Sequence, residues 1–142
     1  MAGNQQDGKQ MPRAVHPREL AAPGGHYSHA TVANSMVFVS GQLPITRDGS
    51  DLGNAPFGAQ AQQALDNVKV ALECAGSGIE GLLQVRVYID DIANWPAFNA
   101  IYAAWAGQSC PARAVLPTGP LHFGLKIEVE AVGMVLRDAT GS

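Results

Sequence analysis

Apolar and polar positions alternate along residues 84–90 (QVRVYID), which is the pattern of a strand with one buried face. The apolar positions of this stretch are Val85, Val87 and Ile89. A longer strand is predicted over residues 125–136, with one face formed by Leu125, Ile127, Val129 and Ala131. Its other face carries Lys126, Glu128 and Glu130, followed by Val132 and Met134. A face that is polar first and apolar later favours partial burial against another chain, with a polar pocket at one end.

Two further segments repeat apolar residues at helical spacing, and each predicts a helix with one face on a core. Over residues 58–75 the apolar stripe consists of Ala61, Ala64, Leu65, Val68, Leu72 and Ala75. Off this stripe fall Gln60, Gln63, Asn67 and Lys69, and Gly76 is suited to end the helix. The second stripe consists of Phe98, Ile101, Tyr102 and Trp105. Asn94 is expected to cap this second helix, and Pro96 is tolerated in its first turn.

Short β-rich runs occupy residues 27–33 and 36–41. Asn34-Ser35 lies between them and predicts a two-residue hairpin. The segments 44–57 and 117–124 are rich in Pro and Gly and are expected to be loops, the first with room for a short edge strand.

With a further short strand over residues 112–116, the predicted order is strand, strand, loop, helix, strand, helix, strand, strand. This order is typical of an α+β fold, in which two helices pack on one face of a sheet. The other face then needs a cover, and self-association supplies one. Residues 1–23 are rich in Gln, Gly, Pro and charge without any period, so a flexible tail is expected there, followed by a single domain over residues 24–142.

Composition and charge narrow the classes of function. The chain has 142 residues, of which 46% are hydrophobic and 15% charged, and its formal net charge is −3. Disorder along the whole length is excluded, and the few basic residues do not form the surface that nucleic acids require. No apolar run is long enough to span a membrane, and the N-terminus lacks the apolar core of a signal peptide. Two cysteines without a CxxC pair agree with a cytoplasmic location.

Motifs for phosphate binding, for a nucleophilic serine elbow and for zinc ligation are absent from the sequence. His26 and His29 are three positions apart on a predicted strand and point to opposite faces, so no metal site is expected there. His122 lies in a loop, where a surface position is the default and a place in a pocket wall is the alternative. Cys74 and Cys110 have no activating neighbour in the sequence and are expected to be inert.

Arg113 stands out because it lies in a short apolar strand (PARAV), where a guanidinium needs an anion or a path to solvent. Two interpretations remain open for it. Either Arg113 forms an ion pair with Glu128 or Glu130, or it binds the carboxylate of a ligand through two parallel hydrogen bonds. Glu128 has the matching alternatives of an ion-pair partner and an acid/base group in a pocket.

Five runs of sequence, in this order and spacing, resemble the reactive intermediate deaminase family, also called the Rid or YjgF family. The runs are GHYSHA (25–30), VFVSGQ (37–42), QALDNV (63–68), PARAV (111–115) and KIEVEA (126–131). The resemblance implies a chorismate-mutase-like α+β fold, with a mixed sheet, two helices on one face, and a homotrimer with sites between subunits. It also implies a cofactor-independent enzyme that hydrolyses 2-imino and enamine acids, such as 2-aminoacrylate, to 2-keto acids and ammonia.

The resemblance assigns roles to residues of this chain. Arg113 matches the arginine that binds the substrate carboxylate. Glu128 matches the glutamate that orients the attacking water and assists proton transfer. Matching residues are expected to line the substrate site at Tyr27, Ser40, Gly41, Asn99 and Val115.

Departures from the founding group leave other functions open. Val115 stands where that group has Cys, and the segment 114–125 differs, so His122 and Phe123 are expected to reshape the pocket mouth. A pathway-specialised relative would hydrolyse a bulkier imine or enamine on the same scaffold. A trimer that binds a small ligand without catalysis is a further alternative, because some family members lack the arginine. A ribonuclease, a label that the family has also carried, is disfavoured by the net charge.

Overall fold

The computed structural model describes residues 11–137, which form a six-stranded sheet covered by two helices. The strands are β1 (Arg13–Val15), β2 (Ala30–Ala33), β3 (Met36–Gln42), β4 (Leu82–Ile89), β5 (Ala112–Pro117) and β6 (Ile127–Met134). The helices are α1 (Phe57–Cys74) and α2 (Trp95–Ala106). Short 3-10 turns are η2 (Ile79–Gly81), η3 (Ile92–Asn94) and η4 (His122–Gly124). None of the helices within residues 11–137 is both long and apolar enough to cross a bilayer.

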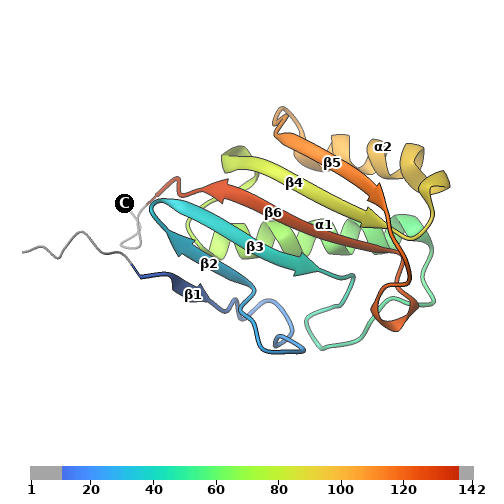
Figure 1. Ribbon diagram of the computed structural model, residues 1–142, viewed down its shortest axis with the longest axis horizontal. Coiled ribbons are helices and arrows are strands. Elements are labelled where there is room, and N and C mark those ends of the chain that lie inside the picture. Colours follow the sequence, from blue (N-terminus) through green and yellow to red (C-terminus); the bar gives the residue numbers. More distant parts are fainter. Residues whose placement is uncertain (1–10, 138–142) are drawn as a thin grey trace, which may run out of the picture.

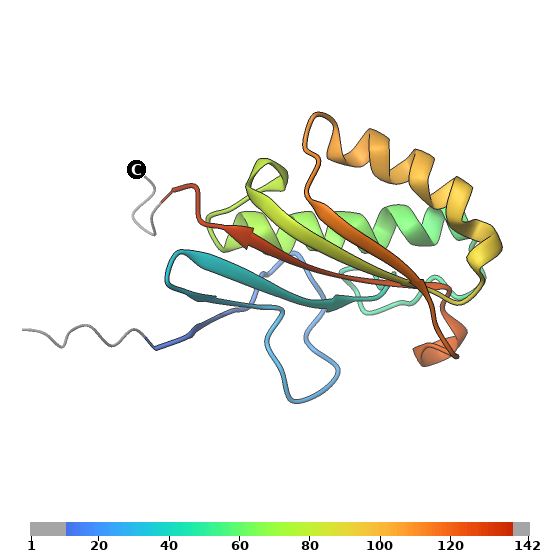
Figure 2. The same cartoon turned by 45° about the horizontal axis from the view of Figure 1, so that its top comes forward.

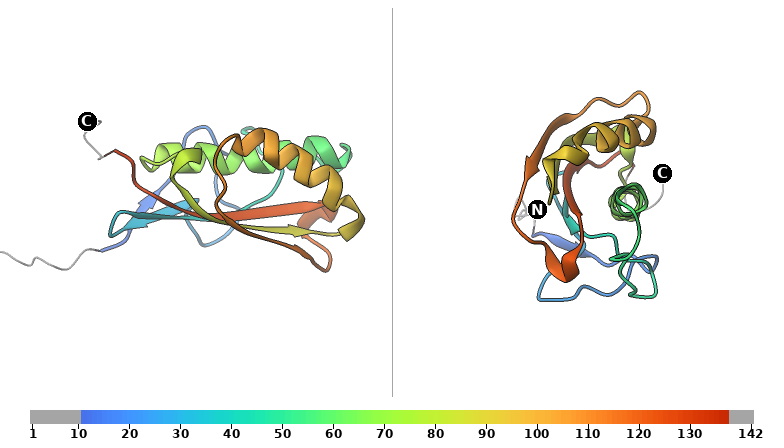
Figure 3. Two further views of the ribbon diagram at one scale, coloured as in Figure 1. Left: turned by 90° about the horizontal axis from the view of Figure 1, so that it is seen from above. Right: turned by 90° about the vertical axis from the view of Figure 1, so that its right-hand side faces the viewer.

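The sheet is mixed, and its strand order is β1-β2-β3-β6-β4-β5 (Figure 1). Neighbouring strands are antiparallel except β4 and β5, which are parallel because α2 makes the crossover between them. Both helices lie on the same side of the sheet, so the described residues form two layers (Figure 3). The predicted α+β architecture with two helices on one face is therefore confirmed.

The core lies between α1 and the strands at the centre of the sheet. The predicted stripe of α1 is buried, from Ala61 to Ala75, and it packs on β3 and β6. Val85, Val87 and Ile89 of β4 are each fully buried in the same core, as their alternation predicts. Gly76 follows the helix with a φ of +87°, the left-handed conformation that favours glycine at a helix end.

The hairpin between β2 and β3 turns at the predicted place. Asn34 and Ser35 have φ values of 52° and 64°, and left-handed conformations at both central positions match the twist of the two strands. The predicted loop 44–57 carries one isolated bridge between Ile45 and Asp51.

Two polar side chains of α1 that the stripe leaves out are buried as well. Gln60 is fully buried, where its Oε1 accepts from the Lys126 amide at 2.9 Å. Asn67 is 5% exposed, and its Nδ2 donates to the Leu43 and Ile45 carbonyls at 3.1 and 3.0 Å. The prediction that both lie off the core is wrong, because these amides satisfy main-chain groups of the segments after β3 and before β6.

The N-terminal boundary also needs correction. The sequence predicts a tail over residues 1–23, but Arg13–Val15 pair with β2 as an antiparallel edge strand, and Val15 and Leu20 are buried in the core. The strand Arg13–Val15 is too short to show a hydrophobic period, and its neighbours are charged or Pro-rich. Its pairing with β2 therefore arises from tertiary contacts. The rest of the expected tail, residues 1–10, lies outside the described residues.

Helix α2 begins after Asn94, but the Asn94 side chain makes no capping hydrogen bond. The prediction that Asn94 caps this helix is therefore wrong. Asp91 instead accepts from the Ala93 amide and caps the preceding turn η3. Pro96 lies in the first turn of α2 as predicted. The predicted stripe faces inward, with Phe98 and Tyr102 buried and Ile101 and Trp105 packed partly against the core.

Candidate functional site

Arg113 lies on the edge strand β5 with its side chain on the helix-covered face. It is in register with Val85 of β4, which in turn pairs with Ala131 of β6, and both of these neighbours are buried. Its Nη1 donates to Oδ1 of Asn99 at 3.0 Å, and its Cζ lies 4.8 Å from the ring centroid of Tyr102. Both partners belong to α2, which lies beside β5 (Figure 2). A hydrogen bond and a cation–π contact thus hold the guanidinium in a defined plane.

Of the two interpretations of Arg113, the ion pair with Glu128 or Glu130 is not formed in the described residues. Among the described residues, the salt bridge of the sheet joins Arg86 to Glu130 at 3.9 Å. The Tyr88 hydroxyl also donates to Glu130, and this bond raises the pKa of Tyr88. Arg113 has only a neutral amide and an aromatic face as partners in residues 11–137, so its guanidinium remains able to receive a carboxylate from outside.

Glu128 lies on β6 with its side chain on the face that the helices leave open. It is in register with Tyr88, which pairs with Leu116 on the other side. The Glu128 carboxylate packs against Gly41, where any Cβ would collide with Oε2. Burial raises the pKa of Glu128 above its usual value, His122 lowers it in part, and Glu130 raises it further. A carboxyl with this shift is suited to exchange a proton closer to neutral pH.

The two principal residues of the predicted site therefore lie on opposite faces of the sheet. Arg113 shares the face of Val85, and Glu128 shares the face of Tyr88, three positions further along β4. Side chains at odd spacing in neighbouring strands point to opposite sides. One copy of the chain does not direct both groups at the same ligand atom, and a site that uses both needs two copies.

Ser40 and Gly41 form an irregularity in β3 beside Glu128. The pairing of β3 with β6 runs from Val39 opposite Ala131 to Gln42 opposite Val129, so β3 contains one extra residue here, as in a β-bulge. The Ser40 hydroxyl donates to the Ser28 carbonyl at 2.6 Å. The bulge places Gly41 against the Glu128 carboxylate, while the Ser40 side chain bonds to the segment before β2.

A buried pair that the sequence did not point to supports this bulge. Nε2 of His29 donates to the Ala21 carbonyl at 2.7 Å, so Nδ1 accepts from the Gln42 amide at 3.1 Å. The same amide donates to the Ser40 carbonyl at 3.1 Å. His29 and Gln42 are 8% and 3% exposed. The sequence feature that could have indicated this pair is a His and a Gln at the ends of two strands that are predicted to pair.

A cavity of about 530 Å³ opens beside Gly41. Its walls come from three segments, residues 20–29, 41–51 and 122–123, together with Asn67 of α1. Figure 1 shows the loop after β5 and the loop between β3 and α1 at the same end of the molecule. Tyr27 lines this cavity, half exposed, and its hydroxyl accepts from the Gly24 amide at 3.4 Å. His122 and Phe123 also line it, as expected for residues at a pocket mouth.

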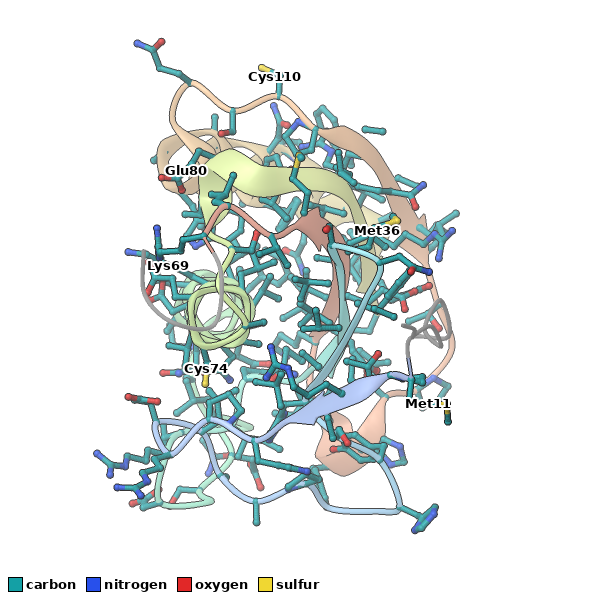
Figure 4. The ribbon with its side chains drawn as sticks, turned by 90° about the vertical axis from the view of Figure 1, so that its left-hand side faces the viewer. Met11, Met36, Lys69, Cys74, Glu80 and Cys110 are labelled. Atoms are coloured by element: carbon teal, nitrogen blue, oxygen red, sulfur yellow. The ribbon has the colours of Figure 1, made fainter. Side chains whose placement is uncertain are left out.

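Val115 and the cysteines take no direct part in this cavity. The Val115 side chain is in register with Val87 and packs against the core, on the same face as Arg113. Cys74 and Cys110 are both exposed and free, and Figure 4 shows them at well-separated points. The predicted residues thus fall into two groups. The Arg113 group contains Asn99, Arg113 and Val115, and the Glu128 group contains Tyr27, Ser40, Gly41 and Glu128.

Comparison with known proteins identifies the family. A sequence model described as Endoribonuclease L-PSP matches residues 18–135. Protein HMF1 of Saccharomyces cerevisiae is 32% identical over 111 residues, which are 78% of this chain and 85% of that protein. The 2-iminobutanoate/2-iminopropanoate deaminase of Escherichia coli K12 is 29% identical over 127 residues, which are 87% of this chain and 98% of that protein.

Solved structures agree with the sequence matches. The crystal structure of yeast Mmf1 has a TM-score of 0.84 and 28% identity. The match covers 88% of this chain and 99% of the Mmf1 chain. The crystal structure of the YjgF gene product of E. coli has a TM-score of 0.81 and 29% identity, with coverage of 86% and 98%. The chain therefore belongs to the YjgF/Rid family, whose sequence model carries the endoribonuclease L-PSP description.

Proposed function

We propose that this protein hydrolyses 2-imino and enamine acids, of the 2-aminoacrylate type, to 2-keto acids and ammonia without a cofactor. The observation that carries the proposal is the Arg113 guanidinium, fixed by Asn99 and Tyr102 and free of any carboxylate partner in residues 11–137. A planar 2-imino acid offers a carboxylate that such a fork binds through two parallel hydrogen bonds. The deaminase name of the E. coli relative supports the same reaction.

The reaction requires one group that accepts and donates a proton and one group that binds the substrate carboxylate. Water attacks C2 of the protonated imine and forms a C–O bond, while the π-electron pair of the C=N bond moves to nitrogen. Glu128 takes a proton from the water and returns it to the nitrogen. The C–N bond then breaks, the hydroxyl becomes the keto group, and its proton leaves with ammonia as ammonium. Proton transfer of this kind contributes about 10²–10⁴-fold, and anchoring by Arg113 supplies the positioning.

The site in this proposal lies between two subunits of a homotrimer. Arg113 of one copy and Glu128 of the next form it, because a single copy directs them to opposite faces. The open face of the sheet supports such an assembly, since Phe38 and Met134 on it are 47% and 45% exposed. Apolar side chains at these positions favour a subunit contact.

A ribonuclease is disfavoured by charge. The whole chain has nine basic and twelve acidic residues, and the Arg113 and Arg86 guanidinium groups lie on opposite faces of the sheet instead of forming one basic surface. A binding protein without catalysis uses Arg113 equally well, so turnover has to be measured.

The test is release of 2-keto acid from imines that an amino-acid oxidase generates in situ. The wild-type protein accelerates release, and Arg113→Ala lowers kcat/KM by about 100-fold, because a charged double hydrogen bond and its positioning are both lost. Arg113→Lys retains the positive charge but cannot form the two parallel hydrogen bonds, so its kcat/KM is expected to lie between those of wild type and Arg113→Ala. Arg13→Ala, which removes an exposed arginine of β1, serves as the matched control and retains activity. Equal rates for wild type and Arg113→Ala would refute the proposal.

A further inference from the structure

The cavity lined by Gly41, against which the Glu128 carboxylate packs, is larger than the smallest imino acids require. Its volume of about 530 Å³ falls within the range of pockets that enclose drug-sized ligands. A three-carbon imino acid fills a small part of this space. Gly41, Leu20, Leu43 and Ile45 are among the residues that line the cavity.

The buried polar groups of the wall are already occupied by partners within the chain. His29 bonds to the Ala21 carbonyl and to Gln42, and the Asn67 amide donates to two carbonyls of the loop after β3. These groups offer a ligand little further hydrogen bonding. The side chains of Leu20, Leu43 and Ile45 are apolar, so this part of the cavity selects ligands by shape and apolar surface.

Phe123 completes the wall in an unusual conformation. Its φ of 61° and ψ of 19° are left-handed, which a bulky side chain rarely adopts. Its ring is 70% exposed and lies 6.0 Å from the His122 ring. The turn is held by main-chain bonds from Gly124 to Leu121 and from Leu125 to His122. An exposed phenyl ring held on a strained backbone at the wall of a cavity is a feature that contact with a ligand in the cavity would explain.

We infer that the cavity receives the side chain of a 2-imino acid with a large apolar or aromatic substituent, and that Phe123 is the wall against which this substituent packs. The inference rests on the proposed function, because the carboxylate and C2 of the ligand are placed by Arg113 and Glu128. The substrate class is thereby narrowed from small imines to those that leucine- or phenylalanine-like amino acids produce.

The experiment compares imines of alanine, leucine and phenylalanine as substrates of the full-length protein. Wild type is expected to give the higher kcat/KM for the large imines. Phe123→Ala lowers the ratio of large to small kcat/KM by about tenfold, within the range that loss of an apolar contact produces. Ala22→Phe fills the cavity from an exposed wall position and lowers the same ratio. Ile92→Ala removes an exposed apolar side chain of η3, outside the cavity, and leaves the ratio unchanged.

Binding of the 2-keto acid products supplies a second measurement that does not need turnover. Calorimetry is expected to show tighter binding of phenylpyruvate than of pyruvate, with the difference reduced in Phe123→Ala. If no imine is accelerated but this binding preference is found, the deaminase proposal fails and the inferred ligand class stands. If imines are hydrolysed with preference for the alanine imine, or if neither cavity variant changes the ratio, the inference is overturned while the deaminase proposal stands.

Discussion

At the scale of single residues, the most informative group is the Glu128 carboxyl. It lies against Gly41 because that position has no side chain, and its half-buried setting disfavours the charged form. The titratable groups that act on it are His122, which favours ionisation, and Glu130, which opposes it. In the proposed reaction Glu128 acts as the base when it is ionised, so its raised pKa sets the pH below which activity is expected to be lost.

The pH dependence of catalysis follows from these neighbours. Protonation of Glu128 removes the base, so kcat/KM falls as the pH drops, and it begins to fall above the usual range of a glutamate. His122→Gln removes the positive charge that lowers the Glu128 pKa. The acid limb of the profile therefore moves to higher pH in this variant. The measurement is kcat/KM against pH for wild type and variant with one imine.

His16→Gln is the matched control, because His16 is exposed next to β1 and outside the cavity. Its profile should overlay that of the wild type. An acid limb that stays in place or moves to lower pH in His122→Gln would contradict the assignment of Glu128 as the base with His122 as its electrostatic neighbour.

At the scale of elements, periodicity predicted both helices, the β2–β3 hairpin and the two long strands, because each buries one regular face. It failed at Gln60 and Asn67, whose burial depends on carbonyl and amide groups of distant segments that no local pattern records. Periodicity did not predict the strand β1 for the same reason, since the pairing of β1 with β2 is set by tertiary contacts. The placement of Arg113 and Glu128 on opposite faces required the strand order, because β4 lies between β5 and β6 in the sheet although β5 and β6 follow each other in the chain.

The Asn67 contacts lead to a prediction about the stability of the cavity wall. Asn67→Ala leaves the Leu43 and Ile45 carbonyls without their donor, which is expected to lower the free energy of unfolding by about 1–3 kcal/mol. Gln62→Ala, on the exposed side of the same helix, is expected to change it by less than about 0.5 kcal/mol. Urea unfolding at one fixed protomer concentration measures both values. Equal stability of the two variants would show that this link does not hold the loop.

At the scale of the whole molecule, the sheet separates the Arg113 side chain from the Glu128 side chain. The helices cover one face, and Arg113 lies under their edge, while Glu128, Arg86 and several exposed apolar side chains occupy the other face. In the proposed homotrimer, the edge of one copy meets the open face of the next, and the same contact is repeated at every interface. Under this proposal each site takes Arg113 from one copy and Glu128 from another.

Subunit mixing tests this division of labour. Arg113→Ala and Glu128→Gln are each expected to have about one hundredth of the wild-type activity or less as pure proteins, because every site lacks one group. When equal amounts are unfolded and refolded together, about one quarter of the interfaces in a random cyclic assembly combine an intact Arg113 with an intact Glu128. The mixture should therefore recover about a quarter of the wild-type rate, and an assembled mass three times that of the 14.8 kDa chain should accompany it. Mixing each variant with itself is the control. A mixture that stays inactive although its subunits have exchanged would mean that both groups of each site come from one copy, contrary to the faces on which the sheet places them.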